Sequence, residues 1–164
     1  VKHATANESN QSSLLVIKVA GVDPDDSSKR APIQQEEAVQ LAAYLQEIKD
    51  AGVRISLVNE AADEFQCEVN IYYDPTKDPL TVQSDCEHAI KDYVENLPFN
   101  GEFSNMALID TIQAVDGVKI ADLVSSEAAP ASTTTFAPIN AYIVPTAGYF
   151  HVANINLNMN AHSL

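Results

Sequence analysis

The sequence predicts an α+β fold, a ferredoxin-like split βαβ sandwich with two extra C-terminal β-strands. Residues 65–73 alternate apolar and polar side chains, which indicates a strand with one buried face. Residues 82–97 instead repeat apolar side chains at steps of three and four, which indicates a helix lying on a core. Up to residue 124 the expected elements follow in the order β-α-β-β-α-α-β, which is the order of that motif.

The first half of the chain is predicted to contain a strand, a helix and two further strands. Residues 14–19 are a β-branched run, which indicates a mostly buried strand. From Ile33 the pattern becomes helical, and Gly52 is a natural stop. Residues 53–57 alternate like residues 65–73, and the link between these strands is short enough for a hairpin.

The second half is predicted to contain two helices and a strand before residue 124. The longer helix spans about residues 81–96 and begins either at Thr81 or at the capping box formed by Ser84 and Glu87. A shorter helix follows, with Ser104 as its expected cap, and the last strand of this series covers residues 118–124.

Four segments follow from these patterns. Residues 1–13 form a polar N-terminal segment, and residues 14–124 form the α+β sandwich domain. Residues 125–138 are rich in Ala, Ser, Thr and Pro and are predicted to be a linker or long loop. Residues 139–164 are predicted to form a C-terminal hairpin or arm, which either extends the sheet or projects from it. The apolar side of its last strand must be covered by its own domain or by a neighbour.

Composition and charge limit the classes of partner. Apolar residues make up 46% of the chain and charged residues 20%, as in ordinary folded proteins. With 23 acidic and nine basic residues the formal net charge is -14, which argues against nucleic acid and membrane surfaces as partners. Cys67 and Cys86 are too few for a disulfide scaffold and are expected to act as small buried hydrophobes.

No catalytic residue, cofactor site or metal site is predicted. The four histidines form no ligand pair, and no GxSxG, Walker or GxGxxG motif occurs. The one carboxylate cluster is formed by Asp23, Asp25 and Asp26, and carboxylates one residue apart can hold Mg²⁺ in a nucleotidyltransferase. The Gly-Ser step before such a pair is absent, as are the glycine and glutamate of a calcium loop. We interpret this cluster as a solvated loop.

Two polar strand faces are the features that this search leaves unexplained. Gln66, Glu68, Asn70 and Tyr72 lie on the outer side of one predicted strand, and an asparagine ladder decorates the last strand. Solvent exposure is sufficient to explain both features, and contacts with other subunits are the alternative, because exposed strands offer edges and polar faces for strand addition.

Several short motifs resemble a known family. They are IYYDP at residues 71–75, LPFNGEF at 97–103, LID at 108–110 and VDGV at 115–118. Together they resemble the C-terminal region of baseplate J-like proteins, which build the wedges of contractile phage tails and related injection machines. The resemblance extends to phage-derived genes of gut bacteria, some labelled nucleotidyltransferase, which are longer at the N-terminus. The chain therefore resembles a C-terminal portion of such a tail wedge protein.

The resemblance implies a non-enzymatic assembly component that binds other tail or baseplate proteins in a homo- or hetero-oligomer. It would be cytoplasmic during assembly and part of a virion or phage-like particle afterwards. The alternatives are a nucleotidyltransferase-type enzyme using Asp23 and Asp25, or a surface binding module. The interface candidates come from the outer strand face, the loop after the longer helix and the last strands: Tyr72, Pro98, Phe99, Phe103, Tyr149, Ile155, Leu157 and Met159.

Overall fold

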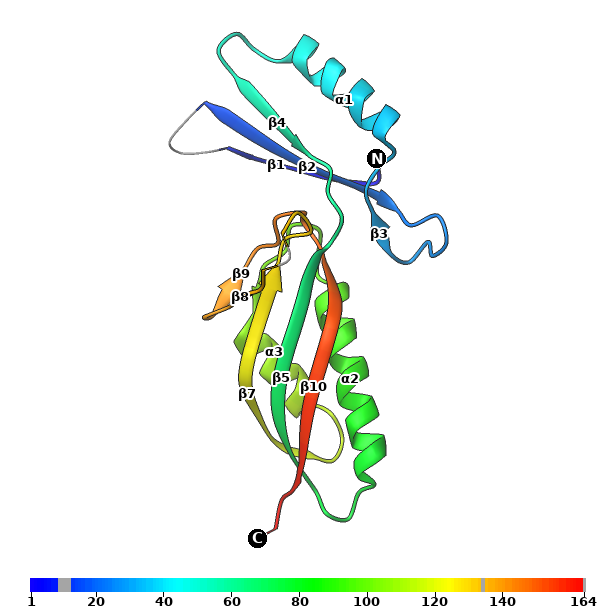
Figure 1. Cartoon of the computed structure of the whole chain (residues 1–164), viewed down its shortest axis with the longest axis vertical. Helices are drawn as coiled ribbons and strands as arrows, with labels where there is room; N and C mark the ends of the chain where they lie inside the picture. Colours follow the sequence, from blue (N-terminus) through cyan, green and yellow to red (C-terminus); the bar gives the residue numbers. More distant parts are fainter. Residues whose placement is uncertain (9–12, 134, 164) are drawn as a thin grey trace.

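The structure, a computed structural model that describes residues 1–8, 13–133 and 135–163, consists of two units stacked end to end (Figure 1). The N-terminal unit holds the elements up to residue 58, and the C-terminal unit holds those from residue 63. The described residues contain three helices and several sheets, so the predicted α+β class is confirmed. Among the residues described, no helix is both long and apolar enough to cross a membrane.

The N-terminal unit is a small sheet with one helix. β2 (Leu14–Val22) lies in the middle, antiparallel to β1 (His3–Glu8) and parallel to β4 (Arg54–Val58). The short β3 (Arg30–Ala31) pairs with the end of β2. α1 (Gln35–Ile48) connects β3 to β4 and covers one face, as the helical pattern after Ile33 predicted. The core of this unit is formed by Val19, Ile33 and Ala38, with Ile17, Leu41 and Leu57 packed against them.

The C-terminal unit is a sheet in the order β10-β5-β7-β8. β5 (Asp63–Tyr73) is its central strand, antiparallel to β7 (Val118–Ala129) and parallel to β10 (Phe150–Ala161). The short β8 (Ala137–Pro138) pairs with the end of β7. β10 is an edge strand, because β5 is the one strand with which it pairs among the residues that the structure describes.

Two helices cover one face of this sheet. α2 (Pro79–Glu95) and α3 (Asn105–Gln113) both lie behind β10, β5 and β7 in the view of Figure 1. A small pair formed by β6 (Phe103–Ser104) and β9 (Tyr142–Ile143) flanks them. The alternation of β5 puts one set of its side chains under the helices, and the buried core is formed by Phe65, Cys67, Val69, Ile71, Val82, Cys86, Ile90, Val94, Phe103, Leu108, Ile112, Ala121, Ala128, Ile139, Phe150 and Val152.

The capping predictions were only partly correct. α2 begins two residues before Thr81, because the Asp78 side chain accepts a hydrogen bond from the Thr81 amide at 2.9 Å and Pro79 fits the first turn. The predicted starts at Thr81 and at Ser84 are therefore wrong. Ser104 does occupy the N-cap position of α3, but its side chain forms no capping hydrogen bond.

The predicted single ferredoxin-like sheet is wrong, because its strands are divided between the two units. The segment between β4 and β5 does not turn back as a hairpin. Asn59 holds it to the N-terminal unit, where its amide donates to the Ile33 carbonyl at 2.9 Å and its Oδ1 accepts from the Ile33 amide at 2.8 Å. The chain then continues forward into a separate sheet.

The two predicted C-terminal strands are present, and the last one extends the sheet, which is one of the two predicted arrangements, but they form neither a hairpin with each other nor a projecting arm. β9 pairs with β6, and β10 extends the sheet alongside β5. The cause lies at Asp63, the first residue of β5, whose carboxylate accepts hydrogen bonds from the amides of Thr146 at 2.7 Å and Ala147 at 3.0 Å. These bonds hold the loop before β10 next to the start of β5, so the last strand runs parallel to β5.

Two segment predictions need correction. Residues 125–129, predicted to belong to a linker, continue β7 because Ser126 and Ala128 point into the core. Residue 134 of the same predicted linker lies outside the described residues. The predicted polar segment 1–13 contains β1, which pairs with β2, while residues 9–12 lie outside the described part.

The two units meet at a small apolar cluster, which we call the joint, formed by Ala20, Ala62, Phe99, Ala147 and Tyr149. A Cβ on Gly148 would lie 2.8 Å from the Phe99 ring, so the loop before β10 packs directly on the loop after α2. Lys18 of β2 reinforces this contact, since its Nζ donates to Asn100 Oδ1 at 2.8 Å and to the Pro145 carbonyl at 2.7 Å.

Candidate functional site

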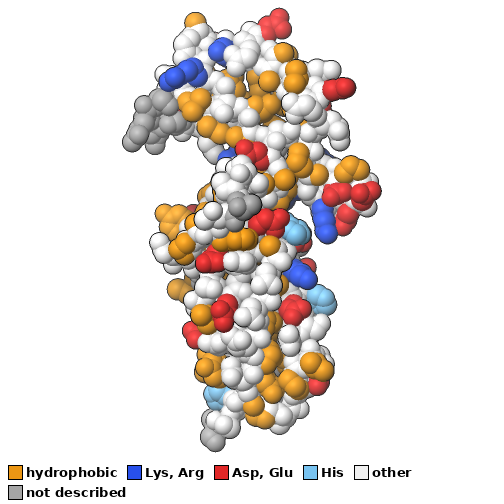
Figure 2. Space-filling view, in the orientation of Figure 1, with side chains coloured by type: hydrophobic (Ala, Val, Ile, Leu, Met, Phe, Trp, Pro, Cys, Tyr) orange, Lys and Arg blue, Asp and Glu red, His pale blue; other side chains and the backbone are white. Residues whose placement is uncertain are grey.

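The helices leave the other face of the C-terminal sheet uncovered. The view of Figure 1 looks onto this side, and Figure 2 shows the same side covered mainly by polar side chains with scattered carboxylates. Four rows of side chains cross β10, β5 and β7 here, and we call them the open face: Asn154, Gln66 and Glu127; Asn156, Glu68 and Ser125; Asn158, Asn70 and Asp122; Asn160, Tyr72 and Ile120.

Hydrogen bonds between neighbouring strands fix the polar side chains of the open face. The Asn158 amide donates to Glu68 Oε1 at 3.0 Å and to Asn70 Oδ1 at 3.1 Å. Asn70 in turn donates to Asp122 Oδ2 at 3.2 Å. In each of these bonds an amide supplies the hydrogen, and the carboxylates are left with free acceptor capacity directed to solvent. The face is therefore ordered before any partner arrives.

The open face is acidic. Its four rows contain Glu68, Asp122 and Glu127 and no Lys or Arg. At one end of the sheet Glu64 Oε2 lies 3.0 Å from Nδ1 of His151, which is the next cross-strand pair in the register. A surface with this charge favours a basic partner surface and repels another acidic one.

Two further features make this side suitable for docking. Within the described part of the chain, the outer edge of β10 has no neighbouring strand, and an edge of this kind can accept a strand from another chain. Ile120 and Val124 on β7 are 45% and 53% exposed, which adds apolar area to the polar rows. Val124 stands opposite no residue of β5, because the ladder has a bulge between Glu68 and Val69.

Of the predicted interface residues, only Tyr72 lies on the open face. Phe103 is fully buried and Tyr149 is 5% exposed, so neither side chain is available to a partner in this conformation. Phe99 forms part of the joint, and Pro98 lies in the turn beside it, with its carbonyl accepting from the Gly101 amide at 2.7 Å. Ile155, Leu157 and Met159 pack against the core of their own unit.

The sequence flagged the correct strands but missed two acidic residues of the open face. The asparagine ladder of β10 and the outer residues of β5 both signalled it, because alternation assigns them to one side. Asp122 was not predicted, because nothing in the sequence indicates which strand lies next to residues 118–124. Glu127 was missed because residues 125–138 have the composition of a linker, although Glu127 lies in β7.

The aspartates considered for Mg²⁺ lie in the loop between β2 and β3 and are used in local turns. Asp23 Oδ1 accepts from the Asp25 amide at 2.8 Å. Asp26 Oδ1 accepts from the hydroxyl of Ser28 at 2.6 Å and from its amide at 3.0 Å, and these bonds lower the pKa of Asp26. Across the described ranges, no group of three or more His, Cys, Asp and Glu side chains is placed to hold a metal ion.

The cysteines behave as the sequence predicted. Cys67 and Cys86 are both buried and unpaired with each other. Burial raises the pKa of Cys67 to about 12 and that of Cys86 to about 11, so both thiols stay protonated at neutral pH. They contribute to packing and offer no nucleophile.

Two comparisons with known proteins found no match. The sequence matches no protein-family model. It also has no significant match among curated proteins. The role of the open face therefore has to be inferred from its own residues.

Proposed function

We propose that the protein is a non-enzymatic structural component of a phage-like tail baseplate that acts through protein–protein contacts. Its partners would be other tail or baseplate proteins, joined in a homo- or hetero-oligomer within a virion or phage-like particle. The observation that carries the proposal is the uncovered acidic face of the C-terminal sheet, bordered by the unpaired edge of β10. The resemblance of residues 71–118 to baseplate J-like proteins is the reason for proposing a phage-like tail baseplate rather than another assembly.

The physical reasons favour docking over chemistry. Side chains that are already held by hydrogen bonds lose little conformational entropy when a partner binds, so less binding energy is spent on ordering them. Carboxylates spread over three strands can match a basic patch on a flat partner surface. Weak individual contacts suffice in a particle, because many copies bind side by side.

Co-purification from cells that express the neighbouring genes tests the proposal. Deleting residues 139–164 would not be informative, because Phe150 and Val152 of β10 belong to the core and the unit would unfold. The sharper variant is Glu68→Lys combined with Asp122→Lys, which reverses the charge of the open face without touching the core. Its control is Glu36→Lys with Glu47→Lys on the exposed side of α1, which changes the net charge equally.

The proposal expects the open-face variant to lose the tail proteins that the wild type and the α1 control both retain. A folded open-face variant that recovers the same partners in the same yield would contradict it. Circular dichroism and thermal unfolding establish that each variant is folded before the comparison is made.

The nucleotidyltransferase alternative is tested separately, by calorimetric titration of the protein with Mg²⁺ and nucleoside triphosphates. The hydrogen-bonded turns that engage Asp23 and Asp26 lead us to expect no saturable heat. Saturable binding at micromolar concentration that disappears in Asp25→Ala would overturn this expectation and favour an enzyme.

A further inference from the structure

The free edge of β10 is the less protected edge of the C-terminal sheet. Proteins usually protect an edge strand with a charged residue, a proline or a very short strand. The opposite edge follows this rule, because β8 has two residues and one of them is Pro138. Residues 155–161 of β10 contain no charged residue and no proline, and they pair with β5 in regular register. Such an edge indicates that another strand covers it.

One set of backbone groups along this stretch faces away from β5. Successive residues of a strand direct their N–H and C=O groups to opposite sides. The amide of His162, just after β10, donates to the Tyr73 carbonyl at 2.8 Å, so the even-numbered residues of this stretch face β5. By alternation, Ile155, Leu157 and Met159 direct their backbone groups outward. The edge can therefore pair with an added strand of about seven residues.

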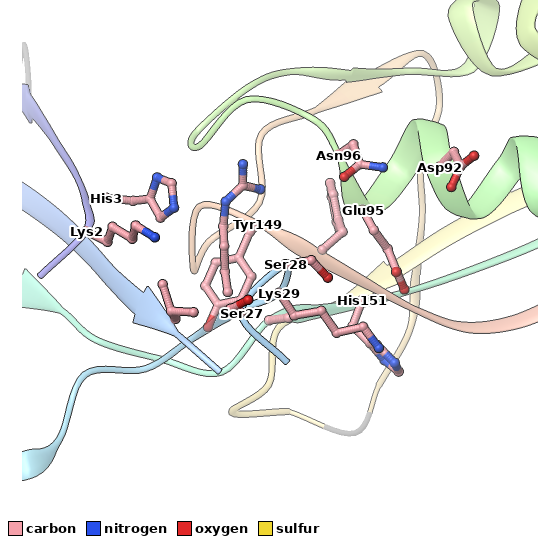
Figure 3. A pocket seen from close by; sticks show the side chains of 14 residues that line it. Lys2, His3, Ser27, Ser28, Lys29, Asp92, Glu95, Asn96, Tyr149 and His151 are labelled. Carbon is pink, nitrogen blue, oxygen red and sulfur yellow. The ribbon is translucent and has the colours of Figure 1, made fainter. Parts of the chain in front are cut away.

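The start of β10 is closed to an added strand. Val152 lies before the irregularity in the register, and its amide donates to Glu95 Oε1 of α2 at 3.1 Å. Figure 3 shows Glu95 extending from α2 toward the strand that carries His151. The carboxylate takes the place that a carbonyl of an added strand would occupy. Strand addition is therefore confined to residues 155–161.

α2 provides a floor for an added strand. It packs on β10, whereas α3 packs on β7, and in Figure 1 it lies on the outer side of β10. Leu80, which is 74% exposed, lies about four turns before Glu95 on the same flank of the helix. Ile155, Leu157 and Met159 direct half-buried side chains to this side of the sheet. The side chains of an added strand that point toward α2 should therefore be apolar.

On the open face the surroundings of the edge are acidic. An added strand would lie beside the asparagines of β10, with Glu68 one strand further in and Asp122 beyond it on β7. The rows of the open face contain no Lys or Arg. A lysine or arginine side chain is long enough to pass over an asparagine and approach Glu68. Side chains that point to the open face should therefore be basic.

The nearby lysines do not reverse this charge. Lys91 of α2 lies on the flank that faces the edge, but Glu87 and Glu95 lie on the same flank at helical spacing, so two carboxylates meet one ammonium group there. The lysines at the far end of the sheet are each paired with an aspartate: Lys77 with Asp116, and Lys119 with Asp74.

A second copy of this chain does not match the edge. Among the described residues, no strand contains more than one Lys or Arg. Three of the nine basic residues, Lys2, Lys29 and Arg30, line a cleft of about 410 Å³ between the two units, where Asp92 and Glu95 also lie (Figure 3). Two copies would also bring together two chains with a net charge of -14 each. The chemistry of the edge therefore fits a different protein.

We propose that residues 155–161 of β10 bind an extended segment of a partner protein in which basic and apolar residues alternate, so that the segment adds a strand to the C-terminal sheet. Its backbone pairs with the outward groups of β10, its apolar side chains lie over α2, and its basic side chains lie on the open face. The inference rests on the proposed function, because it names the part of a partner that docks beside the acidic face.

A capped, fluorescently labelled peptide of about seven residues that alternates valine and lysine tests the proposal on the full chain. Anisotropy should show saturable binding at low salt that weakens as salt is raised. Asn156→Lys with Asn160→Lys places two positive charges at exposed positions beside the edge and should weaken binding by about tenfold. No saturable binding to the wild type would refute the proposal.

The matched control is Gln40→Lys with Gln46→Lys, which makes the same change in net charge at exposed positions of α1. It should bind the peptide like the wild type. Equal weakening in both variants would show that the peptide responds to net charge and would contradict a site at β10. Equally tight binding of a peptide that alternates valine and glutamate would do the same.

Amide exchange resolved by residue, measured by NMR with and without the peptide, tests the pairing itself. In the free protein the amides of Asn156 and Asn158 should be protected by β5, while those of Ile155, Leu157 and Met159 exchange fast. Saturating peptide should slow the second set. Bound peptide that leaves this set unchanged would refute strand addition. Protection of the same set in the free protein, with a dimer in sedimentation velocity, would assign the edge to a second copy instead.

Failure of this inference can be told apart from failure of the proposed function. If the peptide does not bind but Glu68→Lys with Asp122→Lys still loses the tail proteins, strand addition is wrong and docking on the open face stands. If the peptide binds as expected but that variant keeps every partner, the edge site stands and the proposed function is wrong.

Discussion

The two units are built alike, each with a helix-covered sheet, but they differ greatly in what they bury. Counting the described residues, the core of the N-terminal unit has three buried apolar residues, whereas that of the C-terminal unit has sixteen. In α1 the side chains of Val39, Tyr44 and Ile48 are more than half exposed. Because buried apolar area is the main source of stability, most of the folding free energy resides in the C-terminal unit.

This difference suggests a division of roles. A sheet stabilised from one side can leave its other face polar without losing stability, and the C-terminal unit does so. The N-terminal unit places Lys2, His3, Lys29 and Arg30 in the cleft beside the C-terminal unit, opposite Asp92 and Glu95.

The largest expected effect comes from making the same truncation in both cores. Ile90→Ala on α2 removes a fully buried side chain and should cost about 3–5 kcal/mol of unfolding free energy. Ile33→Ala, in the small core where the site can collapse more easily, should cost only about 2 kcal/mol. Chemical denaturation measures both, and equal costs would contradict the proposed concentration of stability.

The next largest loss of stability is expected at the loop before β10. Two glycines with positive φ allow the cost of backbone strain to be separated from the cost of a close contact. Gly148 has φ of +94° and would place a Cβ 2.8 Å from the Phe99 ring, so Gly148→Ala should cost about 2–3 kcal/mol. Gly52 has φ of +90° with nothing within 4 Å, so Gly52→Ala should cost only about 1 kcal/mol. The difference measures how tightly the loop before β10 packs on the loop after α2, and a Gly148 cost no larger than that of Gly52 would show that this packing is loose.

Asp63 should make the free energy of unfolding fall as pH rises. Burial raises its pKa, and the hydrogen bonds from Ala147 and Thr146 together with Lys18 only partly oppose this. A folded-state pKa above the unfolded value means that the native protein binds the proton more tightly. The contribution of Asp63 to stability is therefore greatest at low pH, and it falls as pH rises from the ordinary aspartate pKa of about 4 through the raised value.

Asp63→Asn removes this titration. It should cost about 1–2 kcal/mol, because Asp63 offers an oxygen to each of the two loop amides whereas Asn has one side-chain oxygen, so one amide loses its acceptor. The gap between wild type and variant should narrow as pH rises through that window, as measured by denaturation at a series of pH values. A gap that stays constant with pH would mean that the pKa of Asp63 is not raised.

The smallest expected change in stability is on the open face. Glu68→Gln with Asp122→Asn keeps the shape and hydrogen-bonding size of both side chains while removing two charges. Its unfolding free energy should differ from that of the wild type by less than about 0.5 kcal/mol. A larger loss would show that these carboxylates serve the fold, which would weaken the case for a docking role.

Local pattern predicted the faces of the elements better than it predicted their neighbours. The alternation of residues 65–73 and the stripe of residues 82–97 correctly identified β5 and α2, because burial of one face leaves its period in the sequence. The same alternation does not say which strand lies alongside. The parallel pairing of β10 with β5 depends on Asp63 meeting Thr146, a contact between residues 83 positions apart.

The candidate sites show the same limit. The asparagine ladder was visible in the sequence, but the acidic rows require β5, β7 and β10 in register. The cleft between the units had no local signal, since Lys2 and Arg30, which line it, are far apart in the chain and are brought together by the pairing of β1 and β3 with β2.

Amide hydrogen exchange on the co-purified complex, compared with the free protein, tests the central claim most directly. The claim is that partners dock on the C-terminal sheet, with its open face and the unpaired edge of β10 in contact. Exchange in β10 and in the outer residues of β7 should therefore slow on complex formation, while exchange in α1 stays as it is in the free protein. Slower exchange confined to α1 and unchanged exchange in β10 would contradict the claim and place the contact on the N-terminal unit.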